Sequence, residues 1–135
     1  MSGRLEITVE NTFGAVADSA RRLDDFASES GLSARKTYQL DLIYEELMTN
    51  IVKYSYNDHL PHQISVILEP EGELLSLTIV HDGLDFNPWM TDDPDLTVPL
   101  EQREEGGIGI LLIRKFSKKT FYERRDGKSR LTVLF

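Results

Sequence analysis

The sequence contains no cysteine. This absence excludes disulfide bonds, zinc sites built on thiolates and catalysis by a thiol nucleophile, so any chemistry must come from other side chains. Histidine is also scarce, with three in 135 residues. His59 and His62 flank a proline-containing loop and are too few for a convincing metal site. A solvated loop is the simpler interpretation of this pair.

The sequence also lacks a hydrophobic run that approaches the roughly 20 residues of a membrane-spanning helix. Its first residues, MSGRLEITVE, lack the apolar centre of a signal peptide. Positive charge is in deficit, because 15 Lys and Arg residues face 23 Asp and Glu residues, which gives a net charge of -8. We therefore expect a cytoplasmic chain without direct contact to membranes or nucleic acid. A nucleotide ligand remains compatible with this charge where Mg²⁺ and backbone N–H groups offset the repulsion.

The apolar content, 40% of the residues, is enough for one hydrophobic core and predicts a single domain over residues 1–135. Alternating apolar residues predict a strand over 4–10, a hairpin over 64–79 and a closing hairpin over 120–135. Helical periodicity predicts one helix over 13–30 and a second from the cap residue Ser33 to about residue 56. This order predicts an α/β (α+β) two-layer sandwich, in which a mixed, mainly antiparallel sheet carries its helices on one face.

The second predicted helix contains the segment DLIYEELMTNIVKYSY, from Asp41 to Tyr56. Its apolar residues recur at helical spacing and mark the predicted buried face: Leu40, Ile43, Leu47, Ile51 and Tyr54. Glu46, Asn50 and Lys53 follow the same period along the edge of that face. A carboxylate, an amide oxygen and an ammonium group at a cleft edge suit a proton acceptor, a ligand of metal-bound phosphate and a charge clamp. The alternative is a solvated helix flank.

A glycine-rich stretch precedes the third predicted helix. Residues 105–109 read EGGIG and lead directly into the apolar run 110–113. Glycines that open a buried helix suit a phosphate, because the free N–H groups of the first turn point at the anion. A flexible hinge or close helix packing explains such a run equally well. Residues 88–105 contain three prolines and no sustained period, so we expect a long loop there.

Three stretches occur in a particular order. These are Glu46-Leu-Met-Thr-Asn50 on a helix, Asp82-Gly83 after a strand with Phe86-Asn87-Pro88 behind it, and Gly106-Gly107-Ile108-Gly109-Ile110 at the start of a helix. They resemble the N, G1 and G2 boxes of the gyrase B and histidine kinase (GHKL) ATPase superfamily. With its short length and its ending, GGIGILLIRKF to YERRDGKSRLTVLF, the chain is most similar to the anti-sigma-factor serine/threonine kinases. The resemblance covers nearly the whole chain and implies a Bergerat ATP-binding fold.

The resemblance implies a role for each matching residue. Glu46 would be the general base that activates a serine hydroxyl or water, and Asn50 the ligand that holds Mg²⁺ against the phosphates of ATP. Lys53 would lie near those phosphates. The glycine loop beneath the triphosphate would comprise Gly106, Gly107, Ile108 and Gly109. The loop from Pro88 to Glu105 would be the ATP lid, with Trp89 at its base as a nucleotide clamp, a partner anchor or a residue that tucks the loop onto the body.

The sequence departs from the superfamily at the base-reading position. The aspartate that reads the adenine amino group lies two residues before a glycine in the superfamily, and here His81 precedes Gly83 by two. A neutral histidine could accept one hydrogen bond from the amino group. Asp82 is the other candidate contact, but neighbouring strand residues face opposite ways, so Asp82 would need a bulge or shift to replace it. Asp85 and Ser129 also depart from the pattern.

The expected function is that of an ATP-binding regulatory serine/threonine kinase that phosphorylates an antagonist protein, with ATP and Mg²⁺ as cofactors. By resemblance, its partners would be a sigma factor and a single-domain antagonist, and a homodimer is the family's usual form. One alternative is a degenerate nucleotide-binding module that binds these proteins without phosphotransfer. An ATP-hydrolysing or histidine-kinase-related accessory is a weaker alternative, because the sequence shows no dimerisation and phosphoacceptor helix pair before the domain.

Overall fold

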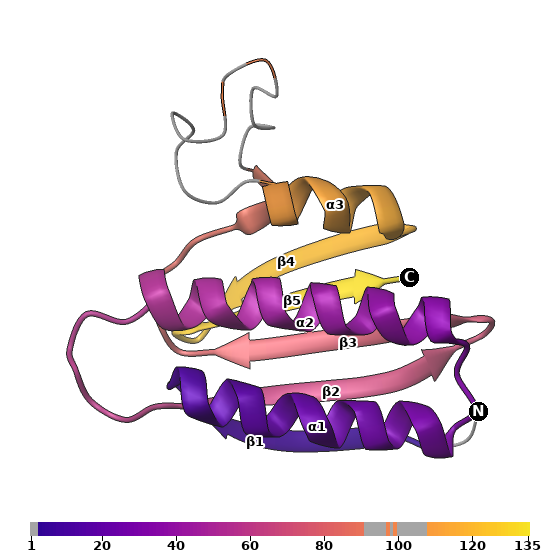
Figure 1. Cartoon of the computed structure of the whole chain (residues 1–135). Coiled ribbons are helices and arrows are strands. Elements are labelled where there is room, and N and C mark those ends of the chain that lie inside the picture. The colour runs from indigo at the N-terminus through magenta and orange to yellow at the C-terminus, as the bar shows by residue number, and fades with distance from the viewer. Residues whose placement is uncertain (1–2, 91–96, 98, 100–107) are drawn as a thin grey trace.

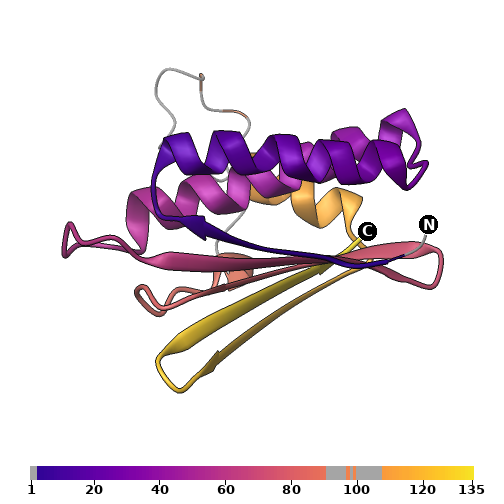
Figure 2. The same cartoon turned by 90° about the horizontal axis from the view of Figure 1, so that it is seen from below.

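The computed structural model describes residues 3–90, 97, 99 and 108–135. In chain order its elements are β1 (Leu5–Glu10), α1 (Phe13–Glu29), α2 (Ala34–Tyr54), β2 (Gln63–Glu71), β3 (Leu74–His81), the 3₁₀ helix η1 (Pro88–Met90), α3 (Ile108–Phe116), β4 (Lys119–Arg125) and β5 (Lys128–Leu134). The described strands form a sheet in the order β1-β2-β3-β5-β4, with antiparallel pairing throughout. The three described α-helices lie on one face of this sheet, as Figures 1 and 2 show. The predicted two-layer sandwich is confirmed.

Local sequence signals explain where the elements begin and turn. The Thr12 side chain accepts a hydrogen bond from the backbone N–H of Ala15, and the Ser33 side chain accepts one from Lys36. Both long helices therefore have a capping residue, and Ser33 is the one that the sequence predicts. The β4–β5 hairpin turns at Asp126 and Gly127, which have φ angles of 53° and 76°. Positive φ at both central residues is the tight hairpin geometry that Asp-Gly favours.

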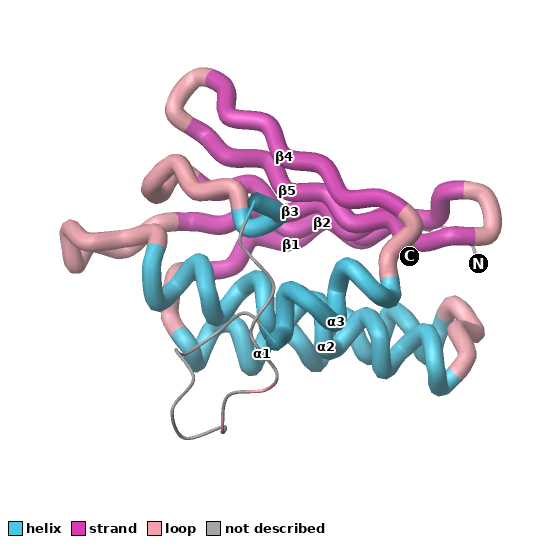
Figure 3. The backbone as a smooth tube through the Cα atoms, turned by 90° about the horizontal axis from the view of Figure 1, so that it is seen from above, coloured by secondary structure: helices cyan, strands magenta, loops and turns pink. Residues whose placement is uncertain are grey.

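The core lies between the helices and the helix-facing side of the sheet. Inward positions alternate along each strand, and the register places Val66 of β2 beside Ile79 of β3, with Leu131 of β5 beside Ile79 on its other side. α1 lies over β1, and α2 lies between α1 and α3 (Figures 1 and 3). The middle helix, α2, therefore packs against the centre of the sheet, and one of its edges contacts α3.

The predicted buried face of α2 needs correction at one residue. Tyr54 is 55% exposed, because the helix ends there, two residues earlier than expected. Tyr44 and Met48 are fully buried instead. The Tyr44 hydroxyl can lie in the core because it shares a 2.6 Å hydrogen bond with Ser19 of α1. The aromatic anchor of α2 thus lies in its middle and not at its end.

The third helix follows the glycine-rich stretch as predicted, beginning at Ile108. Residues 88–90 of the expected lid form η1, whereas most of the rest of that segment, together with Gly106 and Gly107, lies outside the described residues. Within the part of the chain that the structure describes, no helix has both the length and the apolar character to span a bilayer.

Candidate functional site

α2 and α3 meet at the first end of the candidate site. Glu46 and Asn50 lie one helical turn apart on α2, and the Asn50 Nδ2 atom donates to Glu46 Oε1 over 3.3 Å. Gly109, in the first turn of α3, faces them directly. A Cβ atom built at Gly109 would overlap the carboxyl end of Glu46. The structure therefore brings together the predicted base, the predicted metal ligand and a glycine of the predicted phosphate loop.

The second end lies where β3 stops beside the end of α2. A Cβ atom at Gly83 would lie 2.5 Å from the backbone oxygen of Ser55, so only glycine fits without displacing that backbone. The next residue, Leu84, donates its N–H to the same Ser55 oxygen over 2.8 Å. Glu46 and Ser55 are nine residues apart, which at the rise of an α-helix separates the two ends by about 13 Å. Lys53 lies between them in the last turn of α2.

His81 is the last residue of β3, and only 3% of it is exposed. Its Nδ1 atom accepts a hydrogen bond from the backbone N–H of Gly83 over 3.1 Å, so the proton of the neutral ring belongs on Nε2. Burial is the main cause that lowers the pKa of His81 to about 4, and the Arg124 guanidinium lowers it further. His81 is therefore neutral at physiological pH, but the nitrogen that could accept a hydrogen bond from adenine already accepts one from the backbone of Gly83.

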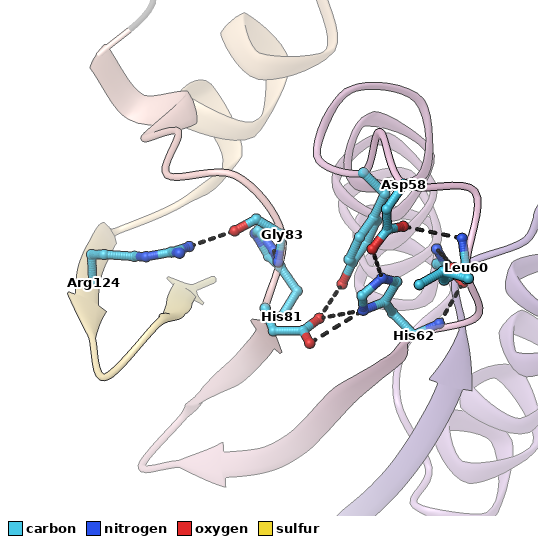
Figure 4. Close-up of polar contacts among 9 residues, drawn as sticks. Asp58, Leu60, His62, His81, Gly83 and Arg124 are labelled. Atoms are coloured by element: carbon cyan, nitrogen blue, oxygen red, sulfur yellow. Dashed lines mark hydrogen bonds and ion pairs between the residues drawn. The ribbon is translucent and has the colours of Figure 1, made fainter.

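Asp82 turns toward the loop that follows α2. Its Oδ1 atom accepts a hydrogen bond from the Tyr56 hydroxyl over 3.0 Å, and both of its oxygens lie 3.2 Å from Nδ1 of His62. The other ring nitrogen of His62, Nε2, lies 2.7 Å from Oδ2 of Asp58. Figure 4 shows this cluster on one side of the strand end and Arg124 on the other. Asp82 thus fastens the strand end to the loop.

Known proteins similar to this chain identify its family. The sequence matches the model of the family described as histidine kinase-like ATPase domain over residues 9–135. The chain belongs to this family. Serine/threonine-protein kinase BtrW of Bordetella bronchiseptica is 31% identical over 129 residues, which cover 96% of this chain and 89% of that protein. The resemblance seen in the three sequence boxes is therefore confirmed at the level of the family.

Solved structures support the fold. The RsbU and RsbW domains of a Mycobacterium tuberculosis protein match with a TM-score of 0.69 and 14% identity, over 98% of this chain and 32% of that one. The SiaB–SiaC complex of Pseudomonas aeruginosa matches with a TM-score of 0.62 and 14% identity, over 96% of this chain and 88% of that one. This chain spans about a third of the first protein, and identities this low show similarity of fold alone.

The supporting roles of two residues at this candidate site were not predicted from the sequence. Arg124 Nη1 donates to the carbonyl oxygen of Gly83 over 2.7 Å and to Oγ of Ser129 over 2.8 Å. Ser129 is fully buried and lies opposite His81 in the β3–β5 register. A signal for Ser129 was available, because it is in phase with the apolar residues Leu131 and Val133 of β5, and a polar residue at an inward position needs a partner.

Two aromatic residues fix the segment after the strand. The Tyr122 hydroxyl of β4 donates to the Asp85 carboxylate, which gives this departure from the superfamily pattern a structural role. Trp89 donates its indole N–H to the backbone oxygen of Phe121 over 2.9 Å, and its own carbonyl accepts from Arg114 of α3 over 2.8 Å. Of the three roles expected for Trp89, these contacts match that of tucking the loop onto the body.

The residues present fit a magnesium nucleotide. Mg²⁺ prefers oxygen ligands. Because Nδ2 of Asn50 is bonded to Glu46, the oxygen of the same amide points away from that bond, and no contact among the described residues occupies it. Because Gly109 has no side chain, the carboxyl end of Glu46 lies directly against the first turn of α3, whose N–H groups suit an anion. Groups of three or more His, Asp or Glu side chains that could hold a metal alone are absent from the described residues.

Proposed function

We propose that this protein binds ATP with Mg²⁺ and transfers the terminal phosphoryl group to a serine or threonine of a partner protein. The observation that carries the proposal is the contact between Gly109 and Glu46, with Asn50 bonded to the same carboxylate. This contact joins the proposed base, the proposed metal ligand and a helix N-terminus at one point. Membership of the histidine kinase-like ATPase family and the similarity to BtrW support the assignment.

Each of these residues would have a distinct task. The Glu46 carboxylate would accept the proton of the attacking hydroxyl group, and its bond to Asn50 holds it on the cleft edge. Asn50 would hold Mg²⁺ through its amide oxygen, and Lys53 would add positive charge near the phosphates. The bound Mg²⁺ would supply neutralisation of phosphate charge. Phosphoryl transfer requires mainly positioning and charge neutralisation, which this set of groups provides.

The partners would be proteins. The name of the SiaB–SiaC structure describes a complex, which supports a partner protein for a chain of this fold. By the resemblance to anti-sigma-factor kinases, we propose a single-domain antagonist as the phosphorylated protein and a sigma factor as the regulated one. A homodimer is the form we expect for the active protein.

A degenerate nucleotide-binding module is the second candidate, and the tautomer of His81 favours it. The Gly83 N–H occupies Nδ1, so the free nitrogen Nε2 carries a proton and donates. A donor does not suit the amino group of adenine, whereas it suits an acceptor such as the ring nitrogen N1 of adenine or O6 of guanine. This candidate predicts weak or unselective nucleotide binding and partner binding that nucleotides do not change.

Titration with ATP, ADP and GTP, with and without Mg²⁺, separates the two candidates. Trp89 is the only tryptophan of the chain and begins the expected lid, so its fluorescence should report binding. We expect Mg²⁺-dependent binding of ATP. No binding at millimolar nucleotide, by fluorescence and by calorimetry, would overturn the proposed function. Equal affinities for ATP and GTP would show that His81 does not select adenine.

Replacement of Glu46, the proposed general base, tests catalysis separately from nucleotide binding. Glu46→Gln should lower the rate of phosphotransfer to the partner by about 10²- to 10⁴-fold, the usual contribution of a general base, and leave ATP affinity nearly unchanged. The matched control is Glu45→Gln, since Glu45 is the exposed neighbour on α2. A rate that survives in Glu46→Gln would show that another group removes the proton.

A further inference from the structure

His62 occupies an unusual position between two carboxylates. Nε2 lies 2.7 Å from Asp58 and Nδ1 lies 3.2 Å from Asp82, so each ring nitrogen faces an oxygen that can only accept. A neutral imidazole has one N–H group and can satisfy only one of them. The doubly protonated ring satisfies both. The geometry of this half-buried side chain therefore favours its charged form.

The surroundings of His62 point the same way. The ring of Tyr56 stacks on it with centroids 4.5 Å apart, a placement that favours a cation. The hydrogen bond to Asp58 is the main cause that raises the pKa of His62; burial opposes this, and Asp82 raises it further. From the β1 side, the neighbouring group is the uncharged side chain of Asn11, whose Oδ1 accepts the backbone N–H of His62 over 2.9 Å. The two carboxylates are thus the charged groups that face the ring.

His62 connects a fixed loop to the strand end. Asn11 holds the loop from behind, because it also exchanges backbone and side-chain hydrogen bonds with His62 and Leu60. Asp82 is the residue directly before Gly83. Through Asp82, the charged ring therefore pulls the strand end toward the loop on one side, while Arg124 holds the carbonyl of Gly83 on the other (Figure 4).

We propose that His62 is a positioning residue. As an imidazolium bridging Asp58 and Asp82, it holds the segment from Asp82 to Leu84 in place at the base end of the site, the end around Gly83 where the nucleotide base would lie. The effect on nucleotides rests on the proposed function above, whereas the effect on the strand end does not. Loss of the proton from His62 releases one of the two carboxylates. Where the released carboxylate is Asp82, the described contacts that still hold the strand end are those with Tyr56, Ser55, His81 and Arg124.

Amide hydrogen exchange in the nucleotide-free protein tests the bridge directly. The N–H of Leu84, bonded to Ser55, reports the order of the strand end. After correction for the intrinsic pH dependence of exchange, its protection should be about two- to fivefold greater near pH 6 than near pH 8, the size expected for one partly exposed ion pair. His62→Gln should remove this difference, because glutamine cannot take up the proton. His81 does not contribute, since its pKa of about 4 leaves it neutral throughout this range.

A control variant and an NMR titration test whether His62 is the origin of the difference. His59→Asn is the matched control, since His59 lies in the same loop with a φ of 57°, which asparagine tolerates, and it should keep the wild-type difference. In the wild-type protein, NMR titration of the His62 ring should give a pKa above its ordinary value, and Asp58→Asn should lower it. Protection of Leu84 that is equal at both pH values, or a His62 pKa at its ordinary value, overturns the proposal.

The nucleotide arm compares the affinity for Mg²⁺-ATP near pH 6 and near pH 8 in the wild type and in His62→Gln. Comparison with the variant cancels the titration of ATP itself. The ratio of affinities should favour the lower pH more strongly in the wild type, by about the factor seen for Leu84 protection. Equal ratios would overturn the link between His62 and the nucleotide. Absence of ATP binding at both pH values would instead contradict the proposed function, and the exchange measurement would still decide the role of His62.

Discussion

The candidate site has a phosphate end at Gly109 and a base end at Gly83. Both ends pack against α2, the first against a side chain and the second against backbone. At the phosphate end, Gly109 packs against the carboxyl end of the Glu46 side chain, which can rotate away. At the base end, Gly83 packs against the backbone of Ser55, which cannot move without disturbing the end of the helix. The phosphate end is therefore defined by adaptable side chains and the base end by fixed backbone.

The polar contacts show the same difference. At the phosphate end, the described contact between Glu46 and Asn50 is the 3.3 Å hydrogen bond that Asn50 donates. At the base end, Gly83 is held through its N–H by His81 and through its carbonyl by Arg124. A site of this kind can change its chemistry at one end with little effect on stability, whereas changes at the other end affect folding first.

The largest effect on function should come from Gly109→Ala. Alanine is a better helix former than glycine by up to about 1 kcal/mol, and the Glu46 side chain can move aside, so we expect the free energy of unfolding to change by less than about 1 kcal/mol. The displaced carboxylate should nevertheless lower phosphotransfer by about 10²-fold, as expected for misplacement by about 1 Å. Chemical denaturation and a phosphotransfer assay on the same protein test both halves. Wild-type activity in Gly109→Ala would show that the position of Glu46 is not critical.

A smaller effect, on stability instead of chemistry, should follow Gly83→Ala. Its Cβ atom would lie 2.5 Å from Ser55 O and 2.8 Å from Ser55 Cβ, and relief of such overpacking typically costs about 1–3 kcal/mol. Gly14→Ala is the matched control, because nothing lies within 4 Å of a Cβ atom there, and it should be neutral or slightly stabilising. Denaturant midpoints of the three proteins would decide. If Gly83→Ala were as stable as Gly14→Ala, the contrast between the two ends would be lost.

The same contrast explains which end could be predicted from the sequence. Glu46 and Asn50 lie one turn apart on one helix, so helical spacing alone places them together, and Gly109 was found through the glycine-rich stretch beside an apolar run. The base end depends on contacts between distant residues. His62 precedes Asp82 by 20 positions, and Arg124 follows Gly83 by 41. Periodicity carries no information on such pairs, so the loop histidine was interpreted as solvated and Arg124 was missed.

The fold was more predictable than the site for a related reason. Alternation and turn residues identified every described strand and both hairpins, because strand pairing within a hairpin is local. The exposed position of Tyr54 was not predictable, since the apolar stripe continues in phase to the last residue of the helix. Helix ends depend on what the chain meets next, here the contact of Ser55 with Gly83 and Leu84.

The prediction with the smallest expected effect tests whether the pH response of the strand end originates at His62 or at Asp41 of α2. Asp41 lies five residues before Glu46, and burial, with a hydrogen bond to the Asp24 carboxyl group of α1, raises its pKa to about 7 from 3.8. Folding therefore favours protonated Asp41, so this group's contribution to stability is complete below pH 3.8 and declines as the pH rises toward 7. Above that range the loss is constant.

Asp41→Asn removes the titrating group and keeps a side chain of the same size. The variant should have a higher melting temperature than the wild type near pH 8, and the two melting curves should converge as the pH falls toward 4. Asp25→Asn, at an exposed position of α1, is the control and should parallel the wild type. The pH dependence of Leu84 protection should persist in Asp41→Asn, because that dependence belongs to His62. Its disappearance would move the origin of the pH response from the base end to the packing of α1 on α2.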